Sequence, residues 1–430
     1  MNTLFEANRI GSMLLANRFI RSATWEGMAD NTGKCSSRLI ELMANLARGG
    51  VGLIITGHTY VHKSGRHSPW QLGIDRKELI PSLKKMTRAT HEQNGKIAVQ
   101  LGYGGAYLSK ARLRSLAAAD IHEIVKAYGQ AASRAKNADF DAVQIFAAHG
   151  FFLSQFLCQR YNDRKDLYGG KIKNRARILL EVLDSIRNAV GPDYPVLVKM
   201  NSRDFVENGM SLEEAVQVGL MLQDRGIDAI ELSGGLLNSP NILRADINRE
   251  EDEAYFQNEA RTFKENTKVP LMLVGGIRSY NVARRLIEQG VADYISMCRP
   301  FICEPYLIKR WQSGNLARSA CISCNNCVEQ VKRGHGVSCI PKKSKTETFF
   351  PQLTETLPAS PPHPLGSCYR ISIGLELVDD GFSPVVKVEL EYNGRTLGHP
   401  PYFPLGSDDY TRVSRLIAQL LAQQAGESQN

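Results

Sequence analysis

The stretch DAVQIFAAHGFFLSQF, residues 141–156, carries a histidine in a position suited to proton transfer. Its first half is an apolar run typical of a buried strand, and His149 stands at the end of that run. Imidazole is the side chain that most readily exchanges protons near neutral pH. Phe146, Phe151 and Phe152 stand on either side of it, and phenylalanine can neither donate a proton nor polarise a carbonyl group. The segment therefore predicts an active-site lining whose proton donor is in question.

A second group of reactive residues is a cluster of cysteines. CISCNNC supplies Cys321, Cys324 and Cys327, and Cys339 follows twelve positions later. This spacing lets several thiolates converge on one metal centre, with a fourth ligand from a returning loop. An iron–sulfur cluster, a zinc or other closed structural site, and unligated thiols all remain open. Nine cysteines in 430 residues are too few for a disulfide scaffold.

Two short glycine- and arginine-containing segments predict a phosphate site. VGGIRS, residues 274–279, brings Gly275 and Gly276 to the end of one predicted strand, and MCRP, residues 297–300, brings Arg299 to the end of the next. Glycine lets backbone N–H groups approach phosphate oxygens, and a following helix start adds a positive dipole end.

The elements that must position these residues alternate regularly from the N-terminus to about residue 300. Short apolar runs are followed by longer amphipathic segments, which is the pattern of repeated βα units. The strand candidates are Arg18–Thr24, Val51–Thr56, Lys96–Leu101, Asp141–Ala147, Pro195–Met200, Asp228–Leu232, Pro270–Val274 and Asp293–Met297. Eight such units predict an α/β fold of the (β/α)₈ TIM-barrel type. Catalytic groups of that fold lie at the C-terminal ends of strands, which here carry Ser22 to Glu26, Gly57, Gln100, Phe146 to His149, Lys199, Ser233, Gly275 and Arg299.

The remaining chain predicts additions to the barrel. We expect the barrel over residues 1–315, a Cys-rich segment over 316–345, and a linker over 346–367, where Thr, Pro and Ser are frequent. Residues 368–430 are expected to form a small α+β appendage. Tyr369–Leu377 and Val385–Tyr392 alternate with period two, Asn393-Gly394 is a tight-turn signal, and Ser407 can cap a helix that runs to about Gln424.

Composition and charge exclude several classes of protein. The net charge of +9 is spread along the whole chain, with one local basic run at residues 332–345 and no nucleic-acid recognition motif, so no nucleic-acid partner is expected. No run of about 18 apolar residues and no signal peptide is found, so we expect a cytoplasmic protein without a membrane span. The sequence leaves the oligomeric state open, and an oligomer is one possibility.

Several motifs together carry a resemblance to a known family. They are NRFIRSATWEGMAD, GGVGLIITG, KIAVQLG, FDAVQIFAAHGFFLSQFL, NDRKDLYGGKIKNRARILLEVL, VLVKMNSRDF, IELSGG, LVGGIRS and CISCNNC. Over roughly residues 1–340 the chain resembles the Old Yellow Enzyme family, in the NADH:flavin oxidoreductase branch near bacterial 2,4-dienoyl-CoA reductase.

The resemblance implies a barrel that holds FMN, takes electrons from NADH or NADPH, and passes hydride to an activated double bond of a small molecule. By motif position, Ala23, Thr24 and Trp25 would lie along the isoalloxazine ring and Gly57 near its edge. The pyrimidine side would be contacted by Gln100 and Lys199, and a cation there stabilises the negative charge of the reduced flavin. The implied phosphate ligands are Gly276, Cys298 and Arg299.

The opening stretch departs from this family. Relatives have His-x-x-His or His-x-x-Asn at this strand end, followed two positions later by Tyr, which donates a proton to the substrate. The matching positions here are Phe146, His149 and Phe151. His149 is therefore the predicted catalytic residue that remains, and water, Tyr103 or another side chain would have to protonate the product.

The resemblance also implies a four-iron, four-sulfur cluster, although relatives have three residues between the second and third Cys and this chain has two. About 90 residues follow Cys339 without a Gly-x-Gly-x-x-Gly motif, so any cluster would be structural or would exchange electrons with a donor protein. We therefore expect an FMN-dependent oxidoreductase with an atypical active site. The alternatives are a flavin-binding or electron-transfer protein without enone reductase activity and a barrel without a cofactor.

Overall fold

The computed structural model describes residues 3–104, 110–236, 244–339, 349–378, 381–392, 395–396 and 401–427. The chain divides into two compact units. The first comprises Met1–Ile308 and Ala317–Ile340, and the second comprises Lys309–Leu316 and Pro341–Asn430. The finer domain boundaries expected from the sequence stay predictions.

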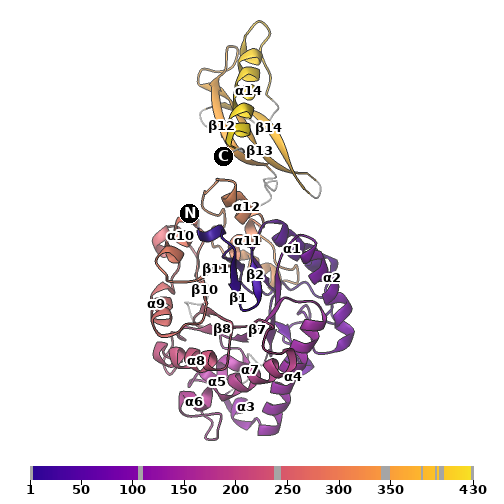
Figure 1. The fold of residues 1–430 in the computed structure, drawn as a ribbon, viewed down its shortest axis with the longest axis vertical. Coiled ribbons are helices and arrows are strands. Elements are labelled where there is room, and N and C mark those ends of the chain that lie inside the picture. Colours follow the sequence, from indigo (N-terminus) through magenta and orange to yellow (C-terminus); the bar gives the residue numbers. More distant parts are fainter. Residues whose placement is uncertain are drawn as a thin grey trace. The chain divides into compact units, whose positions relative to one another are not determined.

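The first unit is a closed parallel barrel (Figure 1). Its eight strands are β3 Phe19–Arg21, β4 Leu53–Ile55, β6 Ile97–Gly102, β7 Ala142–Ala147, β8 Val196–Asn201, β9 Ala229–Ser233, β10 Leu271–Val274 and β11 Tyr294–Met297. Each pairs in parallel with the next, β11 pairs with β3, and β4 pairs with β6 to close the ring, while the short β5 Thr59–Tyr60 extends the edge of β6. All eight predicted strands and the predicted TIM barrel are confirmed.

Helices surround the strands because their apolar faces pack on the barrel. They are α1 Ser37–Arg48, α2 Ile80–His91, α3 Lys110–Ser115, α4 Ala118–Asn137, α5 Phe152–Leu157, α6 Ile172–Arg175, α7 Arg177–Val190, α8 Leu212–Asp224, α9 Gln257–Asn266, α10 Tyr280–Glu288, α11 Arg299–Cys303 and α13 Asn326–Lys332. Helix α12 Leu307–Gln312 begins in the first unit and continues into the second. In α8 the side chain of Ser211 accepts the N–H of Glu214, whose carboxylate accepts the N–H of Ser211. This reciprocal cap fixes where the helix begins.

A short hairpin fills the N-terminal end of the barrel. Strands β1 Asn8–Ile10 and β2 Met13–Leu15 pair antiparallel, and Ile10, Met13 and Leu15 share an apolar cluster with residues from the barrel strands. This packing leaves the C-terminal ends of the strands as the place where polar side chains meet a cavity.

The second unit is an antiparallel sheet with one helix. Its strands are β12 Phe349–Pro358, β13 Ser367–Val378, β14 Gly381–Tyr392 and β15 Arg395–Thr396, in that order, and α14 Asp409–Glu427 packs on β12 and β13. Its core contains Tyr369, Ile371, Ile373, Leu390, Val413 and Leu420. The appendage strands and helix predicted from the sequence are present, while the predicted turn at residues 393–394 lies outside the described residues.

The expected linker over residues 346–367 is wrong for the part that forms β12. This strand pairs with β13 from Phe349↔Glu376 to Pro358↔Cys368. Leu353 and Leu357, four residues apart, pack on the core of the unit. Proline is tolerated there because β12 is an edge strand.

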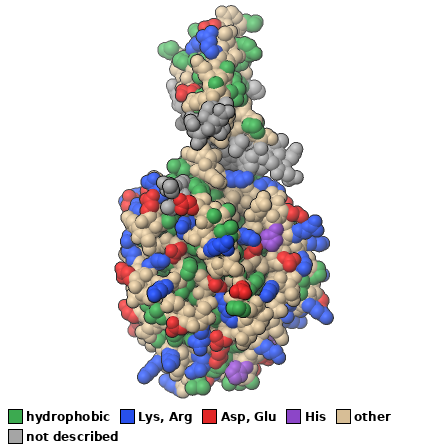
Figure 2. All heavy atoms as spheres, viewed as in Figure 1, with side chains coloured by type: hydrophobic (Ala, Val, Ile, Leu, Met, Phe, Trp, Pro, Cys, Tyr) green, Lys and Arg blue, Asp and Glu red, His purple; other side chains and the backbone are tan. Residues whose placement is uncertain are grey.

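The surface of the barrel carries charges of both signs. Figure 2 shows Lys and Arg side chains interspersed with Asp and Glu over the face in view, as the dispersed charge of the sequence predicts. Within the described parts of the chain, no helix combines the length and the apolar character needed to cross a membrane.

Candidate active site

A cavity of about 510 Å³ lies at the C-terminal ends of the barrel strands. This volume is in the range of small-molecule and cofactor sites. Six of the predicted site residues line it, namely Ala23, His149, Lys199, Gly276, Cys298 and Arg299. Other lining residues include Ser22, Ser233, Tyr255 and Arg278, and from helix α13 Val328 and Lys332.

Lys199 gives one wall of the cavity a buried positive charge. Its Nζ donates to Ser22 Oγ at 2.7 Å and lies 3.4 Å from Glu231 Oε1. The other carboxylate oxygen of Glu231 accepts from Gln144, whose own carbonyl oxygen accepts from the predicted residue Gln100 at 2.8 Å. The strand register produces this series of contacts, because Gln100 pairs with Gln144 and Lys199 pairs with Glu231 on neighbouring strands. The ammonium is thus held in position between Ser22 and Glu231.

His149 lies at the end of β7 with its backbone in the left-handed region, at φ +62°. This conformation costs free energy for a residue other than glycine, and residues that adopt it occur often at functional sites. Its N–H donates to Asn201 Oδ1 at 3.2 Å, and its Nε2 is 2.7 Å from Ser233 Oγ. Burial, followed by the positive charge of Lys199, lowers the pKa of His149 to about 3. The imidazole is therefore neutral near pH 7.

Phe146 and Phe151 form an apolar wall next to this histidine. Their ring centroids are 4.5 Å apart, and the Phe146 ring meets the His149 ring edge-on at 5.9 Å. Both phenylalanines are buried. The side chains at these two positions therefore carry neither a proton nor a hydrogen-bond donor to this part of the site.

Tyr103, the other predicted catalytic residue, has different neighbours. Its hydroxyl is 2.8 Å from Ser64 Oγ, and its ring packs on Phe152 at 4.8 Å. These contacts attach Tyr103 to the turn that contains Ser64. The structure does not bring Tyr103 against His149, and its role as proton donor stays a prediction.

The predicted phosphate segment has the features of an anion site. Gly276 adopts φ +75°, and a Cβ there would lie 2.7 Å from Ile247 and 2.8 Å from Tyr255, so this position requires glycine. Gly275, at φ +147°, has its carbonyl engaged by the N–H of Tyr255. The neighbouring Arg278 is fully buried, and its Nη2 has no hydrogen-bond partner among the described residues. Its Nε donates to the carbonyl of Gly276 at 3.1 Å and its Nη1 to the carbonyl of Cys321 at 2.9 Å, so Nη2 is the one donor left for a phosphate oxygen.

Arg299 and Cys298 are anchored to other parts of the wall. Arg299 Nη1 donates to the carbonyl of Arg244 at 2.7 Å and to Asn325 Oδ1 at 2.6 Å. Cys298 Sγ is 2.8 Å from the hydroxyl of Thr24, another predicted site residue. These contacts link β11 and the Cys-rich segment to the segment after β3.

Gly57 and Trp25 are not among the residues that line this cavity. The N–H of Gly57 donates to both carboxylate oxygens of Glu26, at 3.0 and 3.1 Å, and Glu26 is paired with Arg21 at 2.8 Å. The Trp25 ring packs edge-on against His67 at 5.4 Å. A Cβ at Gly57 would clash with Thr24, so this glycine allows the close approach of two loops.

Two histidines that the sequence reasoning missed lie beside the phenylalanines. His58 Nε2 and His67 Nε2 are 2.5 Å apart. Burial lowers the pKa of both, and for His58 the nearby His67 lowers it further. His58 follows Gly57 at the end of β4, so its position at a strand end was a signal for a site residue. The position of His67 in a loop gave no such signal.

The four cysteines predicted as metal ligands are not gathered into a ligand set. Across the described ranges, which include all four, no group of three or more His, Cys, Asp or Glu side chains is arranged to hold a metal ion. Burial, and then the neighbouring Cys298, Cys321 and Cys339, raises the pKa of Cys327 to about 12. The thiols are chemically suited to iron or zinc, but this geometry does not fit a cluster, and the cluster stays a prediction.

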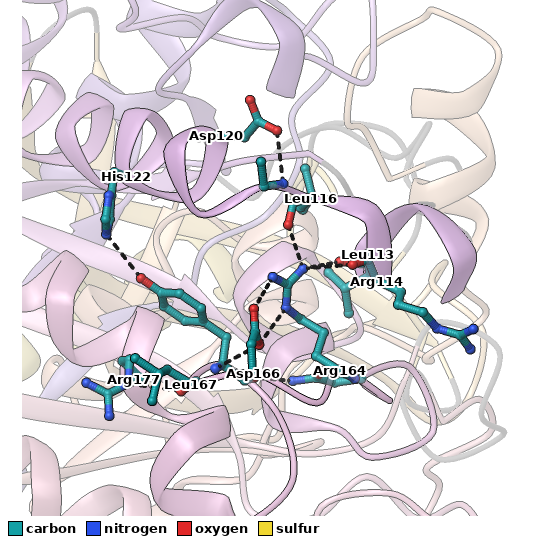
Figure 3. A network of polar contacts seen from close by, with 12 residues as sticks. Leu113, Arg114, Leu116, Asp120, His122, Arg164, Asp166, Leu167 and Arg177 are labelled. Atoms are coloured by element: carbon teal, nitrogen blue, oxygen red, sulfur yellow. Dashed lines mark hydrogen bonds and ion pairs between the residues drawn. The ribbon is translucent and has the colours of Figure 1, made fainter.

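A buried arginine holds the segment that follows α5 in place. Arg164, in the motif NDRKDLYGG, donates to the carbonyls of Leu113, Arg114 and Leu116 and pairs with Asp166 (Figure 3). The three carbonyls belong to α3 and the residues after it. Arg164 therefore ties the loop after β7 to the connection that follows β6.

Comparison with known proteins identifies close similarity over the barrel. Residues 3–115 and 109–317 match the sequence profile of the NADH:flavin oxidoreductase / NADH oxidase family. An NADH oxidase of Thermoanaerobacter brockii is 32% identical over 346 residues, which are 75% of this chain and 52% of that protein. An NADPH dehydrogenase of Bacillus subtilis is 29% identical, over 71% of this chain and 93% of that protein.

Solved structures agree with this result. A complex of 2-naphthoyl-CoA reductase with 2-naphthoyl-CoA superposes with a TM-score of 0.73 at 27% identity, covering 78% of this chain and 56% of that one. The chain thus spans about half the length of the NADH oxidase and of the naphthoyl-CoA reductase that it matches.

Proposed function

Because the chain belongs to the NADH:flavin oxidoreductase / NADH oxidase family, we propose that it is an FMN-dependent oxidoreductase that passes hydride from NADH or NADPH to an unsaturated small molecule. The observation that carries the proposal is the cavity, which combines a buried cation, Lys199, with the phosphate-suited pair Gly276 and Arg278. When bound, FMN supplies the hydride chemistry that protein side chains lack.

The residues of the cavity would hold the cofactor by charge and shape. Arg278, Arg299 and the backbone at Gly276 would bind the phosphate. Lys199, kept in place by Ser22 and Glu231, would stabilise negative charge on the reduced ring. In this role Glu231 limits the effect of the ammonium, because the two charges partly cancel.

The substrate would lie against His149 and the phenylalanine wall. A neutral His149, oriented by Ser233, can donate or accept one hydrogen bond without bringing a positive charge into the site. Phe146 and Phe151 favour a flat, apolar substrate, because aromatic faces pack well on such groups.

The first test is the visible absorption spectrum of protein purified without oxygen, before and after addition of NADH or NADPH, with iron assayed on the same sample. We expect flavin bands that bleach with one of the two nucleotides. Bound iron would support the predicted cluster and an electron-donor protein as a further partner. Colourless protein that does not take up FMN would refute the proposal.

A matched pair of arginine variants tests the phosphate assignment. We expect Arg278→Gln to weaken FMN binding by at least about tenfold, because it removes a charge-assisted contact from the cavity. Arg284→Gln is the control, since Arg284 is exposed on α10 and pairs with Glu288. FMN retained during gel filtration, with circular dichroism to verify folding, measures the effect. Equal retention by the two folded variants would contradict the assignment.

A second candidate function is a flavin-binding or electron-transfer protein that does not reduce enones. Phe146 and Phe151 favour it, because both positions lack a donor. Full FMN occupancy with reduction by a protein donor, and no turnover of enones, would identify this function.

A further inference from the structure

We propose that His58 and His67 form the proton-transfer pair of this site and protonate the substrate at the position where Phe151 offers no donor. This inference rests on the proposed function, because it supplies the proton that completes a hydride transfer to a double bond.

The two imidazole rings lie within hydrogen-bond distance of each other. His58 Nε2 and His67 Nε2 are 2.5 Å apart. Two lone pairs at this distance would repel each other, so one nitrogen must carry a hydrogen that the other accepts. The pair therefore holds an exchangeable proton on a defined axis.

The pair packs directly against the phenylalanine wall. The His58 ring centroid is 5.1 Å from Phe151 and 5.7 Å from Phe146, and the His67 ring centroid is 5.9 Å from Phe151. Phe146 in turn contacts His149, which lines the cavity. The two imidazoles thus place exchangeable protons against the phenylalanine wall.

The two histidines differ in exposure. His58 is only 7% exposed and packs on Phe146 and Phe151, whereas the half-buried His67 can exchange protons with solvent. The fully buried Gln71 fixes both residues. Its Nε2 donates to the carbonyl of His58 at 3.1 Å, and its Oε1 accepts the N–H of His67 at 2.9 Å.

Charged groups on the neighbouring elements are engaged elsewhere. Glu26 is paired with Arg21, and Lys199 with Glu231. Arg66 donates to backbone carbonyls, while His62 and Tyr103 share Ser64. No described contact places a carboxylate on either imidazole, so the pair is neutral at rest, and burial keeps the pKa of each ring below 6.5.

The proton step balances as follows. Hydride adds to the β-carbon of the alkene, the C=C π bond breaks, and its electrons form an anion delocalised from the α-carbon. The imidazolium form of the pair then gives its proton to the α-carbon, forming a C–H bond, and the neutral pair recovers a proton from water through His67. Because the pKa of each imidazole is lowered, the imidazolium form becomes more abundant as the pH falls below 6.5, and this step accelerates.

The experiment uses 1-nitrocyclohexene as the probe and the FMN-loaded full chain, reduced anaerobically with NADH or, if NADH does not react, with dithionite. Hydride addition to a nitroalkene gives a stable nitronate anion, so flavin reoxidation and nitronate decay are two separate signals in a stopped-flow record. We expect wild type to consume the nitronate faster as the pH is lowered. In His58→Gln and His67→Gln, nitronate decay should slow by about 10²–10⁴-fold toward the rate in buffer, while flavin reoxidation changes much less.

Two further variants make the result specific. His62→Gln is the matched control, because His62 lies on the same turn but is exposed and bonded to Ser64. Phe151→Tyr in the His58→Gln background should restore nitronate decay without its dependence on acid.

Nitronate decay that is equal in wild type, His58→Gln and His67→Gln would overturn the proton pair while leaving the proposed function intact. A wild-type decay rate equal to that in buffer at every pH would do the same without any variant. Flavin that no donor or nitroalkene can reduce and reoxidise would overturn the proposed function itself.

Discussion

At the scale of single residues, burial controls the protonation of the imidazoles around the cavity. The pKa of His149 is about 3, and those of His58 and His67 also lie below the usual 6.5. A lowered pKa means that the unfolded chain binds more protons than the folded one once the pH falls below 6.5. These three groups therefore lower the free energy of unfolding as the pH falls from 6.5 toward 3.

This linkage predicts the behaviour of a histidine variant. His149→Gln should lose less stability than wild type between pH 7 and pH 4, because one group that resists protonation has been removed. Urea midpoints measured across that range provide the test, with the exposed His62→Gln as control. An unchanged pH slope in His149→Gln would show that His149 is not a buried neutral imidazole.

The phenylalanine wall gives a second prediction at this scale. Phe151→Tyr, alone or with Phe146→His, should increase the reduction of a simple enone by up to about 10²–10⁴-fold, because it supplies a general acid. Phe403→Tyr in the second unit is the matched control for adding a hydroxyl. The measurement is the rate of 2-cyclohexenone reduction. An unchanged rate in these variants would show that Phe151 does not face the substrate.

Sequence reasoning located the residues that follow directly from strand ends and missed those that depend on loops. His149 and Lys199 were predicted because β7 and β8 are continuous apolar runs with a polar residue near the end. His67 was not predicted, because its contact with His58 depends on the conformation of the loop over residues 61–66. Arg278 was overlooked beside Gly275 and Gly276, since burial of its guanidinium is a tertiary property.

At the scale of elements, the barrel was predictable because parallel strands buried on both faces have an unmistakable apolar signature. Strand β12 was not predictable in this way. Two leucines among Thr and Pro give a hydrophobic period too weak to distinguish an edge strand from a linker. The Cys-rich segment was proposed from cysteine spacing alone, and its role stays a prediction. The position of its cysteines depends on α13 and on left-handed residues such as Ser323 and Asn325, which sequence spacing cannot predict.

The loop anchor in Figure 3 leads to a prediction at this scale. Arg164→Ala should lower the free energy of unfolding by about 2–4 kcal/mol, because it leaves buried carbonyls without donors. Arg177→Ala, which loses one exposed contact to Leu167, should cost less than about 1 kcal/mol. Chemical denaturation of both variants would measure the difference, and equal losses would contradict the anchoring role.

At the scale of the whole molecule, the two units have separate cores, so we expect separate unfolding events. In the second unit the buried Asp409 accepts from the N–H and hydroxyl of Ser360 and from the hydroxyl of Tyr369. Asp409→Ala should lower the unfolding temperature of this unit alone, leaving the flavin spectrum and its thermal release unchanged. Differential scanning calorimetry together with flavin fluorescence measures both, and loss of FMN in step with the second unit would contradict their independence.

The walls of the cavity come from widely separated parts of the chain, from Ser22 to Lys332. During synthesis the site therefore cannot be completed until the segment that forms α13 has left the ribosome. The following residues, 333–430, take roughly 5–20 s to translate at about 5–20 residues per second. The barrel consequently has several seconds in which to close and acquire its cofactor while the second unit is still being made.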